Sequence, residues 1–172
     1  MNVRRQGLGS AVLLLLAAVV LLRPWEDLER LWDEPEPASV RALVTRVVDG
    51  DTVEARFDGR EEDVRLIGVD TPETVKPGTP VQCFGPQASR FSHRRLEGRR
   101  VRLVFGVERR DVYGRMLAYA YLDGHMFNAE LLRRGLARTL TIPPNDRFAE
   151  RFGRLERAAA RAGRGLWGGC GL

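Results

Sequence analysis

The chain contains little of three residue types that often carry chemistry. It has two cysteines and two histidines in 172 residues, and neither their number nor their spacing supports a zinc site. Lysine is nearly absent, because Lys76 is the only one among 28 basic residues and the rest are arginine. No segment repeats internally, and the length suits one domain. The planar guanidinium group of arginine can donate two parallel hydrogen bonds to phosphate oxygens, although genomic base composition can also produce a preference for arginine over lysine.

The first 39 residues differ from the rest of the chain. Arg4 and Arg5 precede the uncharged run 7–22, and residues 23–39 form an acidic, proline-containing linker. No small-x-small cleavage site follows the run, which favours a retained signal anchor at residues 1–22. The run is shorter than the roughly 20 residues of a comfortable bilayer span, so a cleaved signal peptide remains the alternative. Both readings predict export, with a membrane tether if the segment is uncleaved.

The domain that follows, residues 40–172, is basic. It carries 24 arginines and lysines against 17 acids, a net charge of +7. A basic domain suits a polyanionic partner such as nucleic acid. The arginines are spread along the chain, so charge that serves solubility is the alternative.

Cys83 and Cys170 lie far apart in the sequence of a chain that we expect to be exported. Oxidising compartments favour a disulfide over two free thiols. In the chain-entropy model such a closure stabilises the fold by roughly 4.5 kcal/mol. The bond would hold the C-terminus against the body of the domain.

Turn dipeptides divide the domain into strands first and helices later. The expected strands are Arg41–Val48, Thr52–Phe57, Asp63–Val69, Arg100–Phe105 and Arg115–Leu122, and the expected helices are 85–96, 128–134 and 146–162. This order predicts an α+β domain dominated by β-structure. Five strands with a helix after the third is also the order of an OB-fold barrel, although an open mixed sheet fits the same pattern.

Three charged residues share strand parity with apolar neighbours. Asp51, Arg65 and Arg115 each lie on the same predicted face as apolar residues two and four positions further on. Burial of an unpaired charge is costly. We therefore expect these side chains to meet each other, a metal or a ligand at an opening of the domain.

The segment VRLIGVDTPE, residues 64–73, supplies oxygen ligands at the exit of a strand. Asp70, together with Asp51 upstream, offers the hard carboxylate oxygens that Ca²⁺ prefers. Pro72 biases Thr71 to an extended conformation, which makes the Thr71 carbonyl a candidate third ligand. We expect a calcium site here.

The same segment supplies groups that suit phosphodiester chemistry. Arg65 and Arg115 are candidates to donate hydrogen bonds to the non-bridging oxygens, which gain charge in the transition state. Glu73 is a candidate to orient or deprotonate the attacking water. We expect positioning to be its larger contribution, because a carboxylate surrounded by cations is a weak base.

Several segments together resemble the staphylococcal nuclease (thermonuclease) family: VVDGDTV, RLIGVDTPE, FGPQAS, DVYGRMLAY, NAELLRRGLA and the terminal GLW, over roughly residues 40–168. The resemblance implies a five-stranded OB-fold barrel with about three helices, and an N-terminal apolar helix would precede it. It also implies Ca²⁺-dependent hydrolysis of DNA and RNA that leaves 3′-phosphate ends. Matched positions assign metal ligation to Asp51, Asp70 and Thr71, and catalysis to Arg65, Glu73 and Arg115. Tyr113 matches a tyrosine that contacts nucleotide phosphate, and we expect a monomer.

The sequence departs from the family pattern at two places. The secreted representative has tyrosines that pack against the bound nucleotide, whereas this chain reads ARTLTIPPN, and Val112 replaces the lysine of the DKYGR motif. Two alternatives to an enzyme remain. One is a catalytically inactive OB-fold module that binds nucleic acid or protein, and the other is a membrane-tethered structural domain. The complete set of acids and arginines argues against the first, and the second predicts neither cleavage nor salt-sensitive binding of nucleic acid.

Overall fold

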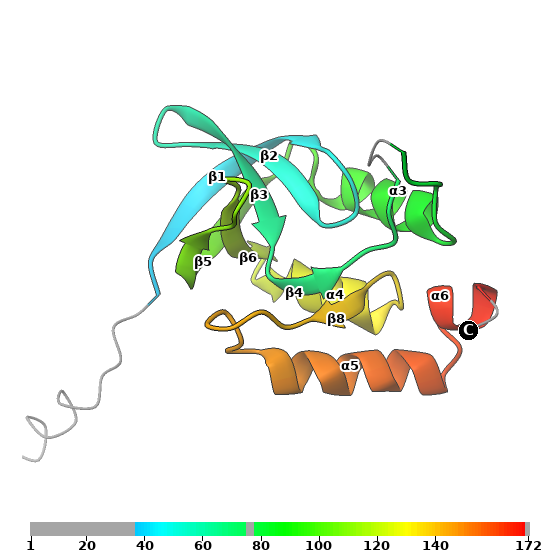
Figure 1. The fold of residues 1–172 in the computed structure, drawn as a ribbon. Helices are drawn as coiled ribbons and strands as arrows, with labels where there is room; N and C mark the ends of the chain where they lie inside the picture. The colour runs from blue at the N-terminus through cyan, green and yellow to red at the C-terminus, as the bar shows by residue number, and fades with distance from the viewer. Residues whose placement is uncertain (1–36, 75–77, 171–172) are drawn as a thin grey trace, which may run out of the picture. The chain divides into compact units, whose positions relative to one another are not determined.

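The computed structural model describes residues 37–74 and 78–170. The predicted signal anchor and nearly all of the predicted linker lie outside these residues. The strands are β1 (Ser39–Val47), β2 (Thr52–Phe57), β3 (Arg60–Leu66), β4 (Gly68–Asp70), β5 (Arg100–Arg110), β6 (Met116–Leu122), β7 (His125–Met126) and β8 (Arg138–Leu140). The helices are α3 (Gly85–Leu96), α4 (Phe127–Arg133), α5 (Ala149–Arg161) and α6 (Leu166–Gly169) (Figure 1). No helix in this part of the chain is both long and apolar enough to span a bilayer.

Five strands of the described residues close into a mixed barrel. β1, β2 and β3 form an antiparallel meander, β5 pairs with the free edge of β1, and β6 pairs with β5. A parallel pairing between β3 and β6, with Val64 opposite Met116, completes the circle. This closure confirms the OB-fold barrel over the open sheet.

The predicted strand Asp63–Val69 is wrong as a single element. β3 ends at Leu66, Ile67 lies in a turn, and Gly68 takes a φ of 78°, a left-handed conformation that glycine tolerates best. The chain then leaves the barrel as β4 and pairs with β8. The buried side chain of Asn128 fixes the bend, because its Nδ2 donates to the Ile67 carbonyl at 2.9 Å.

The three predicted helices are present. α3 has the predicted bounds, with Pro86 in its first turn, while α4 begins one residue before and α5 three residues after the predicted start. α4 packs on β6 and β4, and α5 packs on α4 and β8. Figure 1 shows the β4–β8 pair beside these helices, below the barrel.

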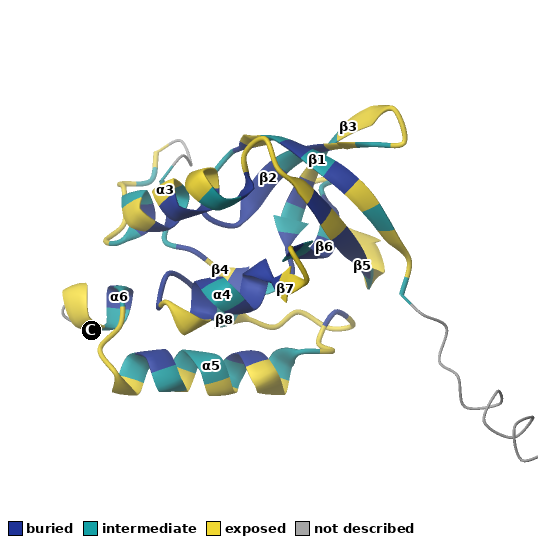
Figure 2. Ribbon diagram, turned by 180° about the vertical axis from the view of Figure 1, so that it is seen from behind, coloured by how far each residue is buried: buried dark blue, intermediate teal, exposed yellow. Residues whose placement is uncertain are grey.

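The core fills the barrel and the space between it and the helices. Leucine, valine and phenylalanine side chains supply the largest fully buried groups, among them Phe127, Phe152, Leu66 and Leu103. Figure 2 shows dark buried stretches on the strands and on α4, with exposed residues along the outer side of α5. Alternating strand residues thus hold the barrel together, and the polar site lies at its rim.

The two cysteines form the predicted disulfide. Cys83 and Cys170 are bonded, with their Cα atoms 5.8 Å apart. The bond joins the segment before α3 to the end of α6. It therefore holds the C-terminal helix against the body of the domain, as expected.

Candidate active site

Asp51 is buried at the start of β2. The preceding turn is closed by the Asp51 amide, which donates to Oδ1 of Asp49 at 3.0 Å, and α3 holds this turn through a hydrogen bond from Ser92 Oγ to the Gly50 carbonyl at 2.6 Å. Oδ2 of Asp51 accepts from both the amide and the hydroxyl of Thr71, at 2.6 and 3.0 Å. Two segments that are distant in sequence therefore meet at one carboxylate.

Burial perturbs the Asp51 carboxyl. Loss of solvent raises its pKa to about 7, against the opposing effects of the Arg65 guanidinium and the Thr71 hydrogen bonds. The nearby Asp49 carboxylate acts in the same direction as burial. An added cation would stabilise the ionised form of this carboxyl, and below about pH 7 it would compete with a proton for it.

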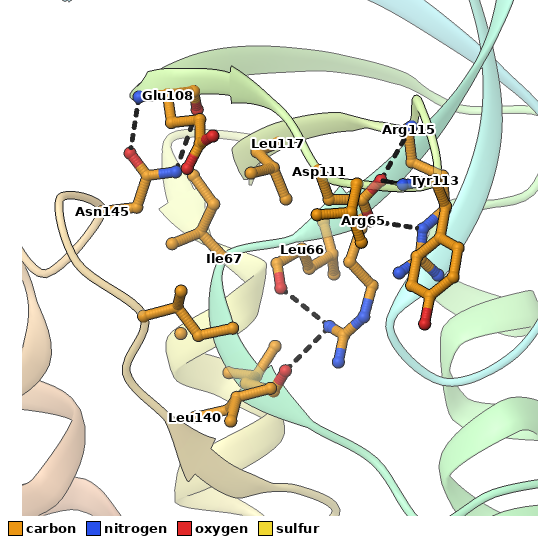
Figure 3. A pocket seen from close by; sticks show the side chains of 14 residues that line it. Arg65, Leu66, Ile67, Glu108, Asp111, Tyr113, Arg115, Leu117, Leu140 and Asn145 are labelled. Atoms are coloured by element: carbon orange, nitrogen blue, oxygen red, sulfur yellow. Dashed lines mark hydrogen bonds and ion pairs between the residues drawn. The ribbon is translucent and has the colours of Figure 1, made fainter.

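Arg65 sits at the centre of the acidic groups. Its Nε lies 3.2 Å from Asp51 Oδ1, and its Nη2 lies 3.1 Å from Asp70 Oδ1. Its Nη1 donates to the carbonyls of Leu66 and Val69 at 2.9 and 2.8 Å (Figure 3). The guanidinium side chain is only 13% exposed, so most of its donors are already used within the protein.

The predicted strand parity of Arg65 is wrong, although its predicted partners are right. In β3 the fully buried residues are Val64 and Leu66, so Arg65 lies on the opposite face of the strand. It is nevertheless covered, because the bend at Gly68 carries β4 back across it and supplies the Val69 carbonyl. Tertiary contact, and not strand alternation, buries this charge.

Arg115 approaches the same region from the turn between β5 and β6. Asp111 organises that turn, because its Oδ1 accepts from the amides of Tyr113 and Arg115, both at 3.0 Å. Its Oδ2 accepts from Arg115 Nε at 2.7 Å. Burial raises the pKa of Asp111, but the hydrogen bonds from Arg115 and Tyr113 outweigh it and lower the pKa overall. Nη1 and Nη2 of Arg115 make no hydrogen bond with another described residue, so they remain available to a ligand.

Asp111 is a functional residue that the sequence reasoning did not single out. It orients Arg115 by holding both its main chain and its side chain. A sequence signal was available, because an aspartate four residues before an arginine, with Gly114 between them, indicates a tight turn. In the structure Gly114 has a φ of 86° and an ion pair between Asp111 and Arg115 closes the turn.

All six predicted metal-binding and catalytic residues line one cavity of about 570 Å³. Its walls also include Tyr113, Asp49, Thr52, Glu54 and Asp63. Glu73 reaches the cavity from the segment that follows β4, and its Oε1 accepts from the Thr74 amide at 2.8 Å. The structure thus brings together every site residue that the sequence predicted.

A second, more apolar cavity of about 350 Å³ is bordered by the same two arginines. Arg65, Tyr113 and Arg115 line both cavities, and Leu117, Leu140 and Ile142 are among the apolar walls of the second. Figure 3 shows Tyr113 and Arg115 on one side of this pocket and Leu140 on the other. Aliphatic side chains from β6, β8 and the segment after β8 therefore form much of the wall of this cavity.

The oxygen donors fit a calcium ion in their chemistry. Asp51 and Asp70 flank one guanidinium, and Thr71 lies against Asp51. Over residues 37–74 and 78–170, no group of three or more acidic, histidine or cysteine side chains forms a metal cluster. A bound ion would therefore take two carboxylates, the Thr71 carbonyl and several waters, which is a coordination that Ca²⁺ accepts.

Comparison with known proteins supports the sequence resemblance. A family model described as staphylococcal nuclease homologue matches residues 63–169. The chain belongs to the staphylococcal nuclease family. It is 49% identical over 125 residues to a thermonuclease of Staphylococcus intermedius, covering 73% of this chain and 74% of that protein. A Staphylococcus hyicus thermonuclease is 45% identical over 124 residues, covering 72% and 73%.

A more distant relative is the endonuclease YncB of Bacillus subtilis, which is 38% identical over 125 residues and covers 72% of this chain and 59% of that protein. The family membership confirms the fold that the resemblance implied. The individual roles of Arg65, Glu73 and Arg115 remain predictions, as do those of the proposed calcium ligands.

Proposed function

We propose that this member of the staphylococcal nuclease family is an exported, Ca²⁺-dependent endonuclease that hydrolyses DNA and RNA and leaves 3′-phosphate ends. The observation that carries the proposal is the convergence of two arginines and three acids on one cavity. The named relatives are nucleases, and the surrounding domain is basic. An inactive binding module would have no need for this complete set.

Each residue has a role that follows from its environment. The Nη groups of Arg115 donate to a non-bridging oxygen of the phosphodiester, and Arg65 adds its charge beside the two aspartates. Glu73 orients a water whose oxygen attacks phosphorus. The P–O5′ bond breaks, the proton that the attacking water loses passes to solvent, the 5′ oxygen takes a proton from solvent, and the phosphate stays on the 3′ side. When bound by Asp51, Asp70 and Thr71, Ca²⁺ would neutralise phosphate charge.

The apolar cavity offers a place for the nucleotide next to the scissile phosphate. It is bordered by Arg65 and Arg115, so a base inserted there keeps its phosphate within reach of both. Leu140 and Ile142 provide apolar contact on one side, and Tyr113 is the one aromatic side chain among the described residues that line the cavity. We expect weaker binding of the base than a wall with further aromatic rings would give, because each stacked base contributes about 1–3 kcal/mol.

The disulfide supports export, because such bonds persist in oxidising compartments. Attachment to the membrane through residues 1–22 is part of the proposal if that segment is retained. We propose that the protein acts as a monomer on nucleic acid outside the cytoplasm, where Ca²⁺ is plentiful.

The test is cleavage of single- and double-stranded DNA and of RNA by the purified full-length chain, with Ca²⁺ or with a chelator. We expect cleavage only with Ca²⁺, and end-labelling should find 3′-phosphates. Arg115→Ala should lower kcat by roughly 100-fold or more, because it removes a donor that acts in the transition state. Arg161→Ala, an exposed change on α5, is the matched control. A wild-type chain that does not cleave with Ca²⁺ would refute the proposal.

A further inference from the structure

The main chain of Glu73 is held by a residue nine positions further on. The amide of Glu73 donates to Oε1 of Gln82 at 3.0 Å. In return, the amide of Gln82 donates to the carbonyl of Glu73 at 2.9 Å. Both main-chain polar groups of Glu73 are thus engaged by Gln82, which sets the direction in which the Glu73 side chain leaves the backbone.

The start of α3 supports the same contact from behind. The carbonyl of Gln82 accepts from the Gly85 amide at 3.0 Å, which makes a tight turn. A Cβ added to Gly85 would lie 2.9 Å from the carbonyl oxygens of Glu73 and Pro72, so only glycine allows this approach. The helix therefore sets the position of the Glu73 backbone through direct packing.

The disulfide fixes the other end of this arrangement. Gln82 directly precedes Cys83 in the chain, and a disulfide links Cys83 to Cys170 at the end of α6. α6 is itself anchored, because Leu166 is buried and its amide donates to the Gly135 carbonyl at 2.9 Å. Gln82 is thus covalently adjacent to a fixed point of the domain.

A second contact strengthens this anchor. Gly169 of α6 lies against the ring of Phe84, so closely that a Cβ on Gly169 would overlap the ring. Phe84 follows Cys83 and forms the N-cap of α3 in a left-handed conformation, with a φ of 65°. The segment from Gln82 to Gly85 therefore contacts α6 through Cys83 and Phe84, and the Glu73 backbone through Gln82 and Gly85.

We propose that Gln82, anchored by the Cys83–Cys170 disulfide, is the positioning residue for Glu73. The inference rests on the proposed function, because Gln82 matters for catalysis only if the Glu73 carboxylate orients the attacking water. Glu73 lies outside any strand or helix, after Pro72, so its backbone takes its position from contacts such as those with Gln82. Gln82 itself is exposed, so it contributes through the direction of Glu73 and little through burial.

The first test compares Gln82→Ala, Gln82→Glu and the control Gln87→Ala, an exposed change on α3, in full-length protein. Gln82→Ala removes the acceptor for the Glu73 amide. We expect kcat to fall about tenfold and KM to change less than about twofold, because misplacement of a catalytic group by a fraction of an ångström has effects of this size. Glutamate keeps an oxygen at the same place and should restore kcat to within about threefold of wild type. Gln87→Ala should match wild type.

A double-mutant cycle assigns the effect to Glu73. In a Glu73→Gln background, Gln82→Ala should lower kcat no further, because the side chain that it positions is already disabled. Additive losses would overturn the inference, as would an active wild type whose kcat is unchanged by Gln82→Ala. If the wild type itself does not cleave, the proposed function falls first, so the two failures are distinguishable.

The disulfide is tested by the variant Cys83→Ser/Cys170→Ser, with circular dichroism to confirm folding. Its kcat should fall about threefold, and adding Gln82→Ala should then cost less than it does in wild type. Amide hydrogen exchange of Glu73, which does not depend on activity, should quicken in both variants. Unchanged exchange at Glu73 in folded Gln82→Ala would refute the inference.

Discussion

Replacement of Arg65 by alanine should destabilise the domain strongly, and the loss should depend on pH. The guanidinium contacts Asp51, Asp70 and two carbonyls while remaining only 13% exposed. Removing one partner of a buried ion pair costs about 3–5 kcal/mol. In the variant Thr71 still donates hydrogen bonds to Asp51, and Asp70 is exposed enough to be hydrated. We therefore expect the free energy of unfolding to fall by about 3 kcal/mol at pH 8, the low end of this range.

The pH dependence follows from Asp51. Its pKa in the folded protein, about 7, lies above the ordinary value of 3.8, so the folded state binds the proton more tightly than the unfolded state. Between pH 3.8 and about pH 7, the free energy of unfolding therefore falls as the pH rises. Loss of Arg65 raises the folded pKa further, which extends the fall to higher pH. The wild type stops losing stability near pH 7, whereas the variant goes on losing it up to pH 8, and one pH unit of this linkage is worth about 1.4 kcal/mol. The variant should therefore lose roughly 1 kcal/mol less at pH 5 than at pH 8.

Urea unfolding followed by circular dichroism, with a chelator at pH 5 and at pH 8, measures both quantities. Arg161→Ala is the control and should change the free energy of unfolding by less than about 0.5 kcal/mol at either pH. A loss below about 1 kcal/mol for Arg65→Ala at pH 8, or an equal loss at both pH values, would refute the reasoning. The structural role of Arg65 also makes Arg115 the cleaner position for testing catalysis.

Three further results are expected. Ca²⁺ binding requires ionised Asp51, so the apparent Ca²⁺ affinity measured by calorimetry should weaken about tenfold for each pH unit below pH 7. An affinity that stays constant from pH 8 to pH 5 would contradict this. Gly50→Ala should weaken Ca²⁺ binding, since its Cβ would lie 2.6 Å from Thr71 Oγ1. The control is Gly153→Ala on α5, whose Cβ would meet only the end of the Arg157 side chain, and equal Ca²⁺ affinities of the two variants would count against the packing argument. Loss of the Cys83–Cys170 bond should lower the free energy of unfolding by at most about 4.5 kcal/mol in urea titrations, and no change would contradict the chain-entropy estimate.

Local sequence signals were sufficient for most of the secondary structure. The Asp-Gly turns separated the first strands, and Pro86 and Gly98 marked the bounds of α3. The break after Leu66 was missed, because Ile67 and Val69 continue a β-rich pattern and Gly68 alone does not reveal a left-handed residue. Pairing of β4 with β8 depends on residues about 70 positions away, and no local pattern reports such a contact.

By itself, the sequence determined which groups are available for chemistry: two aspartates, a glutamate and two arginines in motifs that resemble one nuclease family. It also indicated the disulfide. Only the tertiary structure decided how these groups meet. The pairing of β2 with β3 and the bend at Gly68 set the distances between Asp51, Arg65 and Asp70, and the pairing of β3 with β6 brings Arg115 to the same cavity. The raised pKa of Asp51 and the hold of Gln82 on Glu73 have the same origin, since burial and long-range hydrogen bonds exist only once distant segments pack together.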